Sequence, residues 1–471
     1  MTLRFTFSVY ASFFGAFAAI FALNAVTAST ALLSNFYMAT LPEMSKATSI
    51  YLIAEIALMP TIPIWLKLVT LKRLLNFSGA GFILSSLAAF SMTDADGFVI
   101  ARAFQGAFGG LLLPLPYLFI KSDVAPEQQK SAISIFTTLT ITAPILGPMV
   151  ALSLPVSHVS WLFTLVAVFT LPCLLVASQK KEKREGPFLL SNLFGFILLC
   201  VGLGLFVWAV EHIQLWGGLS NQTFRTFTFS SLTLIVAGLI WQSAQNTPLF
   251  DLRLFKYIES AFVLFMSMLM GVVVYGLLYL IPYYLITVHS ASPSTIFKVI
   301  LYAAIPQILL LPVLLWLRDK LPAYMLISTS FFVLGVMSLI LSYMGVDHGP
   351  QQMLNPQLLR AAGISLLVLP LSLIMLNAAP SHLHNSMSTL YSFFRTLGGA
   401  LSIACISAYI NFRANTYRLD NLAYGQPDNT LEALSYVYAF NDAFGYLSYA
   451  LLFCCGLSIM MGFQLHKRRS K

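Results

Sequence analysis

The feature that most constrains this chain is a series of apolar stretches of about 20 residues, separated by short polar segments. Each stretch is long enough to cross the hydrocarbon core of a bilayer as an α-helix. Only 9% of the 471 residues are charged and 58% are hydrophobic, a composition typical of polytopic membrane proteins. The sequence therefore predicts an all-α, multi-pass membrane protein. The fourteen expected spans lie at about 8–33, 48–69, 75–93, 98–119, 131–154, 159–178, 188–210, 226–243, 259–287, 296–317, 323–344, 360–379, 386–410 and 437–463.

Lysines and arginines are distributed unequally over the two sides that these spans define. If the N-terminus is inside, most of them fall on the cytoplasmic side, including the charged linker 179–187 and the tail 467–471. This is the asymmetry of the positive-inside rule, and it predicts that both termini are cytoplasmic. The net charge of +9 is thus a sign of topology rather than of a nucleic-acid partner. Six basic residues fall outside or at outer ends of spans: Lys46, Arg225, Lys298, Arg360, Arg413 and Arg418.

The sequence lacks the motifs that indicate disulfide bonds, metal binding, ATP binding or catalysis. The five cysteines lie within apolar spans without metal-ligand or disulfide spacing, so we interpret them as small core residues. There is no Walker-type loop and no H-E-x-x-H motif, and polar groups in the spans are isolated rather than clustered. We therefore expect no enzyme activity, no catalytic residues, no cofactor and no metal.

The stretch from Phe98 to Leu154 carries two patterns of particular interest. The first is Arg102-x-x-Gln105-Gly106-x-x-x-Gly110, in which an arginine inside an apolar span must face protein or water rather than lipid. The glycines allow another helix to approach closely. The second pattern is the pair Gly147-Pro148, which removes a helix hydrogen bond and introduces a kink.

These patterns resemble those of the major facilitator superfamily, and most closely its fourteen-helix drug:proton antiporter branch. The fourth helix of that branch carries R-x-x-Q-G-x-x-x-G and its fifth carries G-P-x-x-G-G, although Ala151 and Leu152 replace the closing glycines here. A third match is Ser392-Phe-Phe-Arg-Thr-Leu-Gly-Gly, which is similar to the F-F-R-x-x-G-G element and contains Arg395, Gly398 and Gly399.

The resemblance implies an arrangement of two six-helix bundles with two extra helices between them. On this basis we expect an N-terminal bundle at 1–179, a cytoplasmic linker with two extra transmembrane helices at 180–250, and a C-terminal bundle at 251–471. The polar segment Asn411 to Leu434 is expected to be a flexible external loop.

Glu55 is the only acid that the sequence places well inside a span, roughly 10 Å below the outer edge. An intramembrane carboxylate suggests a functional site, and we consider Glu55 and Arg102 as candidates for proton coupling. The alternative is a structural ion pair between the two residues. The first span contains no acid, where the family usually has an aspartate, and Asn24 is its most polar side chain.

Other polar residues in the spans are candidates for a substrate cavity. Tyr275 and Tyr279 could stack on a substrate or form part of an interfacial belt, and the belt is favoured. Arg395 lies near mid-membrane, where it could meet an anionic group or pair with helix-end carbonyls, and the structural role is favoured. The full set of cavity candidates is Asn24, Gln105, Tyr275, Tyr279, Arg360 and Arg395, and the helix-packing or gating candidates are Gly106, Gly110, Gly147, Pro148, Gly398 and Gly399.

Together these observations predict a proton-coupled secondary transporter that exports amphipathic organic compounds by alternating access. The alternatives are a dedicated transporter of one metabolite, such as a siderophore, and a non-transporting membrane receptor or scaffold on the same fold. The expected partners are a small-molecule substrate, protons and the lipid bilayer, with a periplasmic adaptor as a further candidate. The protein is expected to be a monomer. The expected location is the cytoplasmic (inner) membrane of a bacterium.

Overall fold

The fold is known from a computed structural model, which describes residues 5–177, 190–213, 216, 218–245, 248, 251–422 and 428–469. Within these residues the secondary structure consists of α-helices and short 3-10 helices, with no strand. This agrees with the all-α prediction, since a helix satisfies its own backbone hydrogen bonds inside a bilayer.

The helices are numbered in chain order. In the first part of the chain they are α1 (Phe7–Ala28), α2 (Thr30–Tyr37), α3 (Leu41–Leu58), η1 (Met59–Thr61), α4 (Ile62–Leu68), α5 (Leu71–Ser91), α6 (Ala95–Leu112), α7 (Leu115–Asp123), α8 (Pro126–Ser153), η2 (Val156–His158) and α9 (Trp161–Leu174). They continue with α10 (Leu190–Glu211), η3 (Gly218–Ser220), α11 (Gln222–Ser243), η4 (Leu252–Lys256), α12 (Ile258–His289), α13 (Pro293–Leu309), α14 (Leu311–Lys320), α15 (Ala323–Leu341), α16 (Leu354–Met375), η5 (Ser381–Leu383), α17 (His384–Leu422) and α18 (Asp428–Arg469).

Thirteen helical segments of the described residues are long and apolar enough to cross a membrane. The remaining expected span, 296–317, is formed by α13 and α14, which are separated only by Leu310. Its amide donates to the Pro306 carbonyl and its carbonyl accepts from the Leu314 amide, so the two helices form one interrupted segment. The number and order of the spans therefore agree with the sequence.

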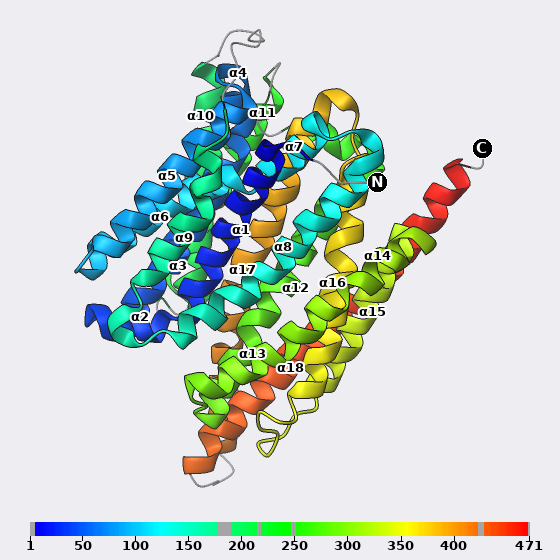
Figure 1. Cartoon of the computed structure of the whole chain (residues 1–471). Coiled ribbons are helices and arrows are strands. Elements are labelled where there is room, and N and C mark those ends of the chain that lie inside the picture. The colour runs from blue at the N-terminus through cyan, green and yellow to red at the C-terminus, as the bar shows by residue number, and fades with distance from the viewer. Residues whose placement is uncertain are drawn as a thin grey trace.

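Helices close in sequence pack together within each part of the bundle. In the first half, which we define as α1–α9, α1 packs on α8 and α9, and α3 packs on α6. In the second half, α12–α18, α12 packs on α17, and α15 packs on α16 and α18. Because the number of crossings is even, α1 begins and α18 ends toward the same end of the bundle (Figure 1).

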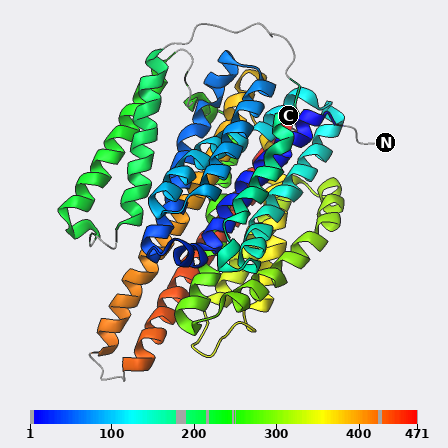
Figure 2. The ribbon, with the colours of Figure 1, turned by 60° about the vertical axis from the view of Figure 1, so that its left-hand side comes forward.

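The helices α10 and α11 form a pair of their own. They pack mainly on each other, and α10 also contacts α3 and α17. Figure 2 shows the pair as green helices at the edge of the bundle. The expected domain boundary at 179–180 and the one at 250 fall outside the described residues, so the division of the chain into 1–179, 180–250 and 251–471 stays a prediction.

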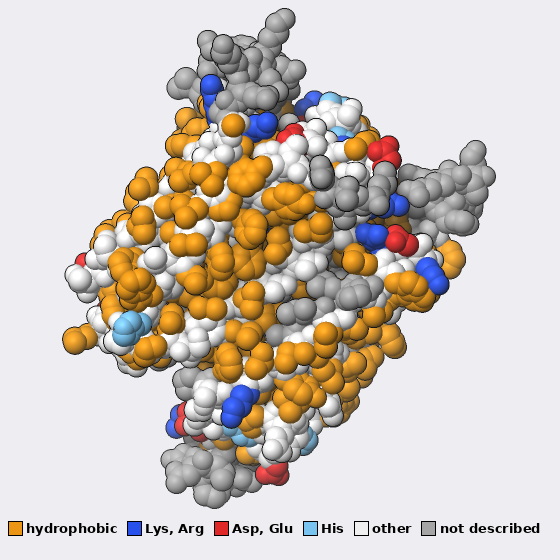
Figure 3. All heavy atoms as spheres, viewed as in Figure 1, with side chains coloured by type: hydrophobic (Ala, Val, Ile, Leu, Met, Phe, Trp, Pro, Cys, Tyr) orange, Lys and Arg blue, Asp and Glu red, His pale blue; other side chains and the backbone are white. Residues whose placement is uncertain are grey.

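Hydrophobic side chains cover most of the face seen in Figure 3, and charged side chains lie toward the two ends of the helices. Many large apolar residues are exposed on helices that would face lipid, such as Phe104 on α6, Val168 on α9 and Phe453 on α18. Such an apolar surface suits a protein whose solvent is hydrocarbon rather than water.

The second membrane-crossing segment runs from Lys46 to Leu68, close to the expected 48–69. Its helix, α3, begins earlier, at Leu41, because Thr40 and Glu43 form a capping box. The Glu43 amide donates to the Thr40 hydroxyl oxygen, and the Thr40 amide donates to the Glu43 carboxylate over 2.9 Å. These reciprocal bonds satisfy amides that the first turn would otherwise leave without partners.

The expected flexible loop from Asn411 to Leu434 is wrong, because most of this segment is helical. Helix α17 runs to Leu422 and α18 begins at Asp428. The polar side chains of this region pair across the two helices instead of forming a loop: Arg413 lies 2.8 Å from Asp442, and Tyr417 donates to the same carboxylate.

Candidate functional site

A cavity lies at the centre of the bundle, between the two halves. Its walls come from α1 and α8 of the first half and from α12, α13, α16 and α17 of the second half. In secondary transporters built from two repeats, the substrate site lies at the interface between the repeats. The lining residues are Ile20, Thr140, Ile141, Pro144, Ile145, Met270, Val274, Tyr275, Leu278, Gln307, Arg360, Ile364, Val368 and Arg395.

Two arginines supply the charge of this cavity. Arg395 on α17 is 5% exposed and Arg360 on α16 is 2% exposed. The Arg360 Nε donates to the side-chain oxygen of Gln357, one turn earlier on the same helix. The Nε and Nη2 atoms of Arg395 have no hydrogen-bond partner in the described part of the chain. The expectation that Arg360 lies at the outer end of a span is wrong, because α16 begins six residues earlier, at Leu354, and buries it.

The structure places three of the six cavity candidates around this site and three elsewhere. Tyr275, Arg360 and Arg395 line the cavity. Asn24 instead donates to the Ile20 carbonyl of its own helix over 2.8 Å. Gln105 donates to Ser86 and accepts from Arg102, while Tyr279 is half-buried and stacks near Tyr283. The roles of all six in substrate binding stay predictions.

Glu55 is buried at the boundary between the halves, with 1% of its surface exposed. It lies nine residues after the start of the membrane-crossing segment Lys46–Leu68, about 13 Å along the helix axis, close to the expected depth. Its carboxylate accepts a hydrogen bond of 3.3 Å from Thr396 on α17, the residue that follows Arg395. Glu55 is thus bonded to the opposite half.

Arg102 is fully buried but is not part of the cavity lining. Its Nη1 donates to Gln105, and its guanidinium lies over the Tyr51 ring at 4.1 Å. No ion pair within 4 Å joins Arg102 to Glu55, both of which are described residues. The geometry therefore does not favour the interpretation of these two residues as a structural ion pair.

The motif glycines lie where helices approach closely. A Cβ atom at Gly106 or Gly110 would clash with the backbone of Tyr51 or Glu55 on α3, because the helices are too close to admit a side chain. At Gly147 it would lie 2.8 Å from the Phe21 carbonyl oxygen. In the second half, Gly398 faces the Met268 backbone and Gly399 faces the Tyr275 ring, whereas Pro148 lies inside α8, which continues through it. Their role in gating stays a prediction.

Two polar lining residues were not identified from the sequence. Gln307 on α13 is 3% exposed, and its side-chain oxygen has no hydrogen-bond partner in the described residues. Thr140 on α8 donates to the Phe136 carbonyl of its own helix. An amide in an otherwise apolar span is a usable signal for Gln307. Thr140 gives no such signal, because threonine commonly bonds to its own helix.

Polar contacts join the halves at the end of the bundle that carries Lys121, which we call the Lys121 end. The Lys121 ammonium donates to the Leu376 carbonyl at the end of α16, where a helix favours positive charge. The hydroxyls of Tyr117 and Ser372 lie 3.3 Å apart, and Ser372 is also 3.0 Å from the Tyr391 hydroxyl. In this conformation the halves are therefore held together at the Lys121 end.

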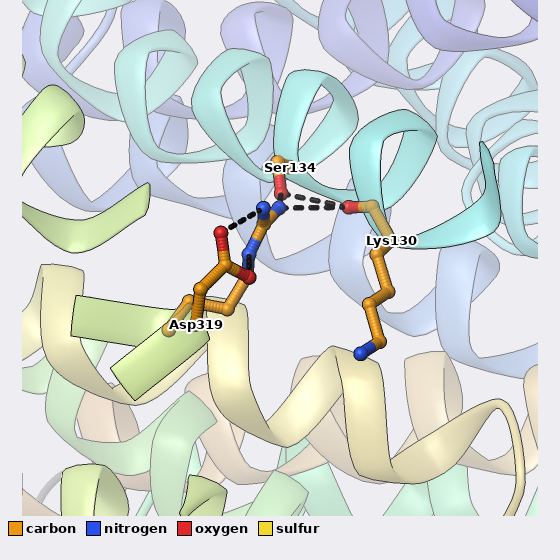
Figure 4. A network of polar contacts seen from close by, with 4 residues as sticks. Lys130, Ser134 and Asp319 are labelled. Atoms are coloured by element: carbon orange, nitrogen blue, oxygen red, sulfur yellow. Dashed lines mark hydrogen bonds and ion pairs between the residues drawn. The ribbon is translucent and has the colours of Figure 1, made fainter. Parts of the chain in front are cut away.

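Arg318 on α14 makes a further contact between the halves at the same end. Its Nη1 donates to the Ser134 hydroxyl over 2.6 Å and to the Lys130 carbonyl over 3.4 Å, both on α8. Its Nε and Nη2 donate to the carboxylate of the neighbouring Asp319. Figure 4 shows Ser134 and Lys130 facing Asp319 across this contact.

The chain belongs to the major facilitator superfamily, whose family model matches residues 11–403. It is 24% identical over 413 residues to the colistin resistance protein EmrB of Acinetobacter baumannii, over 85% of this chain and 79% of that protein. It is 21% identical over 339 residues to the fatty acid resistance protein FarB of Neisseria gonorrhoeae, over 71% of this chain and 67% of that protein. The expected distant relationship to the drug:proton antiporter branch is confirmed.

A solved structure shows the same fold. The human organic anion transporter MFSD10 (TETRAN) aligns with a TM-score of 0.62 over 95% of this chain and 99% of that chain, at 13% identity. At this identity the likeness concerns the fold alone. The protein is therefore a multi-pass membrane protein of a transporter family and not an enzyme, as expected. The described residues contain no group of three metal-ligating side chains.

Proposed function

We propose that this protein is a proton-coupled secondary transporter that exports amphipathic organic compounds by alternating access between its two halves. The observation that carries the proposal is Glu55. It is the only acidic side chain that is buried within a membrane-spanning helix of the described residues. A carboxylate in such a position can gain and lose a proton, and its protonation alters its interaction with the opposite half.

The surroundings of Glu55 support a link between protonation and movement. Its hydrogen-bond partner Thr396 is on α17, so a change at the carboxylate acts directly on the contact between α3 and α17. Thr396 directly follows Arg395, whose side chain lines the central cavity. A proton site bonded to the residue next to this arginine is suitably placed for coupling to cargo.

The direction of transport is proposed from the relatives. Two of them are named as resistance proteins, one for colistin and one for fatty acids. Resistance conferred by a transporter is most simply explained by export. The amphipathic nature of the cargo is proposed from the cavity, which combines two arginines with a largely apolar lining.

The proposal is tested with Glu55→Gln in proteoliposomes, because glutamine mimics the permanently protonated side chain. We expect pH-driven accumulation of an amphipathic dye to fall to background, while counterflow exchange of the same dye and thermal stability are kept. Glu259→Gln is the matched control, since this half-buried acid lies at the start of α12 and bonds to Tyr324. Full gradient-driven transport by Glu55→Gln would remove Glu55 as the coupling site.

We also propose that the Lys121 end is cytoplasmic and that the membrane is a bacterial inner membrane. The asymmetry of lysine and arginine supports this orientation. A single cysteine introduced at Lys183 in a cysteine-free variant should react with an impermeant reagent only from the inside. Reaction from the outside would reverse the topology.

A further inference from the structure

The Arg395 side chain presents an unused pair of donors at the central cavity. Its Nε and Nη2 atoms are buried and without a partner in the described residues. These two N–H groups lie on one edge of the planar guanidinium, which is the edge that binds both oxygens of a carboxylate in parallel. A buried charge with unmet donors is costly, so this arrangement points to a ligand that completes it.

Within the described part of the chain, no acidic side chain fills this role. None of the residues that line the cavity is acidic. Glu55 is the nearest candidate, but no ion pair within 4 Å links it to Arg395 among the described residues. Glu55 instead accepts a hydrogen bond from Thr396, the residue next to Arg395. The cavity therefore carries positive charge that the described protein does not neutralise at contact distance.

Arg360 adds a second charge to the same cavity. It is buried on α16, and only its Nε is bonded to Gln357. Two guanidinium groups that line one cavity repel each other unless an anion lies near both. The second arginine thus strengthens the case for an anionic group rather than for a neutral hydrogen-bond acceptor.

The apolar side chains of the lining indicate that the rest of the ligand is apolar. Apolar side chains from both halves contribute most of the wall, among them Ile20 and Ile141 from the first half and Met270 and Ile364 from the second. A small inorganic anion would leave these surfaces without contact. A compound with an anionic head group and an apolar body would use both parts of the cavity.

We infer that the central cavity binds the carboxylate head group of an amphipathic organic anion, with Arg395 as its bidentate partner and Arg360 as the second positive charge. This inference rests on the proposed function, since it names the class of cargo for the same site. It assigns Tyr275 and the aliphatic side chains to the apolar body of the ligand, and it leaves Arg102 outside the binding site.

The inference is tested by equilibrium binding to the purified full-length protein in detergent, without any gradient. The probes are 2-naphthoate and its uncharged amide, 2-naphthamide, which share the same apolar ring system. We expect the wild type to bind naphthoate at least about tenfold more tightly than naphthamide, the factor expected of a charge-assisted bidentate contact. Equal affinities, or no binding of naphthoate, would overturn the inference.

Variants locate the effect at the cavity. Arg395→Gln and Arg360→Gln should each remove most of the preference for naphthoate while leaving naphthamide binding unchanged. Lys298→Gln is the matched control, because Lys298 is an exposed cation on α13 that does not line the cavity. A preference that survives in Arg395→Gln, or that is lost equally in Lys298→Gln, would contradict the assignment. The wild-type comparison needs no variant, so the inference remains testable if Arg395→Gln does not fold.

The binding experiment also separates this inference from the proposed function. A protein that prefers naphthoate but shows no proton-driven flux would support the anion site and contradict proton coupling. Proton-driven transport of neutral or cationic compounds alone, without a preference for naphthoate in the binding assay, would do the reverse.

Discussion

Arg102 in the first half and Arg395 in the second half are the same side chain in two different surroundings. Each is buried in a helix that packs closely on a neighbour through glycines, and each leaves its Nε and Nη2 without a hydrogen-bond partner in the described residues. Arg102 nevertheless contacts the Tyr51 ring and bonds to Gln105. Arg395 lines the central cavity instead.

The difference shows that the surroundings of a buried charge, more than its burial, indicate what the charge does. Around Arg102 the face of an aromatic ring and an amide oxygen offset part of the cost of burial. Around Arg395 the same cost is left for a ligand to offset. We therefore assign Arg102 to the internal structure of the first half and Arg395 to the binding of cargo.

Replacement of each arginine by methionine should change the stability of the protein differently in the two halves. Arg102→Met loses the contact with Tyr51 and leaves the Gln105 side-chain oxygen without its donor, so we expect a loss of about 2 kcal/mol in stability. Arg395→Met removes a charge with unmet donors and keeps most of the side-chain volume. Such replacements are often neutral or stabilising, so we expect a change between 0 and about +1 kcal/mol.

The apparent thermal midpoints of the two purified variants, measured at equal protein and detergent concentrations, test this contrast. Arg102→Met should melt several degrees below the wild type and Arg395→Met at or above it. A lower midpoint for Arg395→Met than for Arg102→Met would reverse the two assignments.

Much of the fold follows from the sequence, because the apolar runs are long and the breaks between them are polar. Helices extend beyond the apolar runs where polar residues belong to them. Thr40 and Glu43 start α3 before its apolar run through a capping box, and Arg413 with Asp442 allows α17 and α18 to extend beyond the apolar core. In these places a polar residue is satisfied by another part of the protein rather than by water, and a single sequence does not show its partner.

The candidate site is only partly accessible from the sequence for a similar reason. Arg102 and Arg395 stand out as charges in apolar runs, and their burial could be anticipated, whereas the sequence places Arg360 at the outer end of a span. Which of them faces the cavity depends on how each helix is rotated in the bundle. The contact between Glu55 and Thr396 joins residues 341 positions apart, so only the packing of α3 on α17 reveals it.

Arg318 extends the comparison to an arginine whose donors are used. Its guanidinium bonds to the carboxylate of Asp319 and, across the halves, to Ser134 and the Lys130 carbonyl. The hydrogen bond from Arg318 lowers the pKa of Asp319 below its ordinary value. Because Asp319 is the next residue in the chain, this ion pair orients Arg318, and only the bonds to α8 resist separation of the halves.

Arg318→Met should therefore have the smallest effect on stability and a selective effect on conformation. Loss of hydrogen bonds in a partly exposed contact is expected to shift the balance between closed and open states at the Lys121 end by about 1 kcal/mol, or roughly fivefold in population.

A cysteine at Ser372 in a variant without native cysteines reports this opening, because that residue lies between Tyr117 and Tyr391 when the halves are together. We expect Arg318→Met to speed its labelling severalfold. Arg253→Met should not, because Arg253, which lies just before α12, pairs with Asp251 two residues earlier in the chain. The side-chain hydrogen bonds of that pair do not reach α8. Equal labelling rates in the two variants would show that the contact with Ser134 and Lys130 does not hold the halves together.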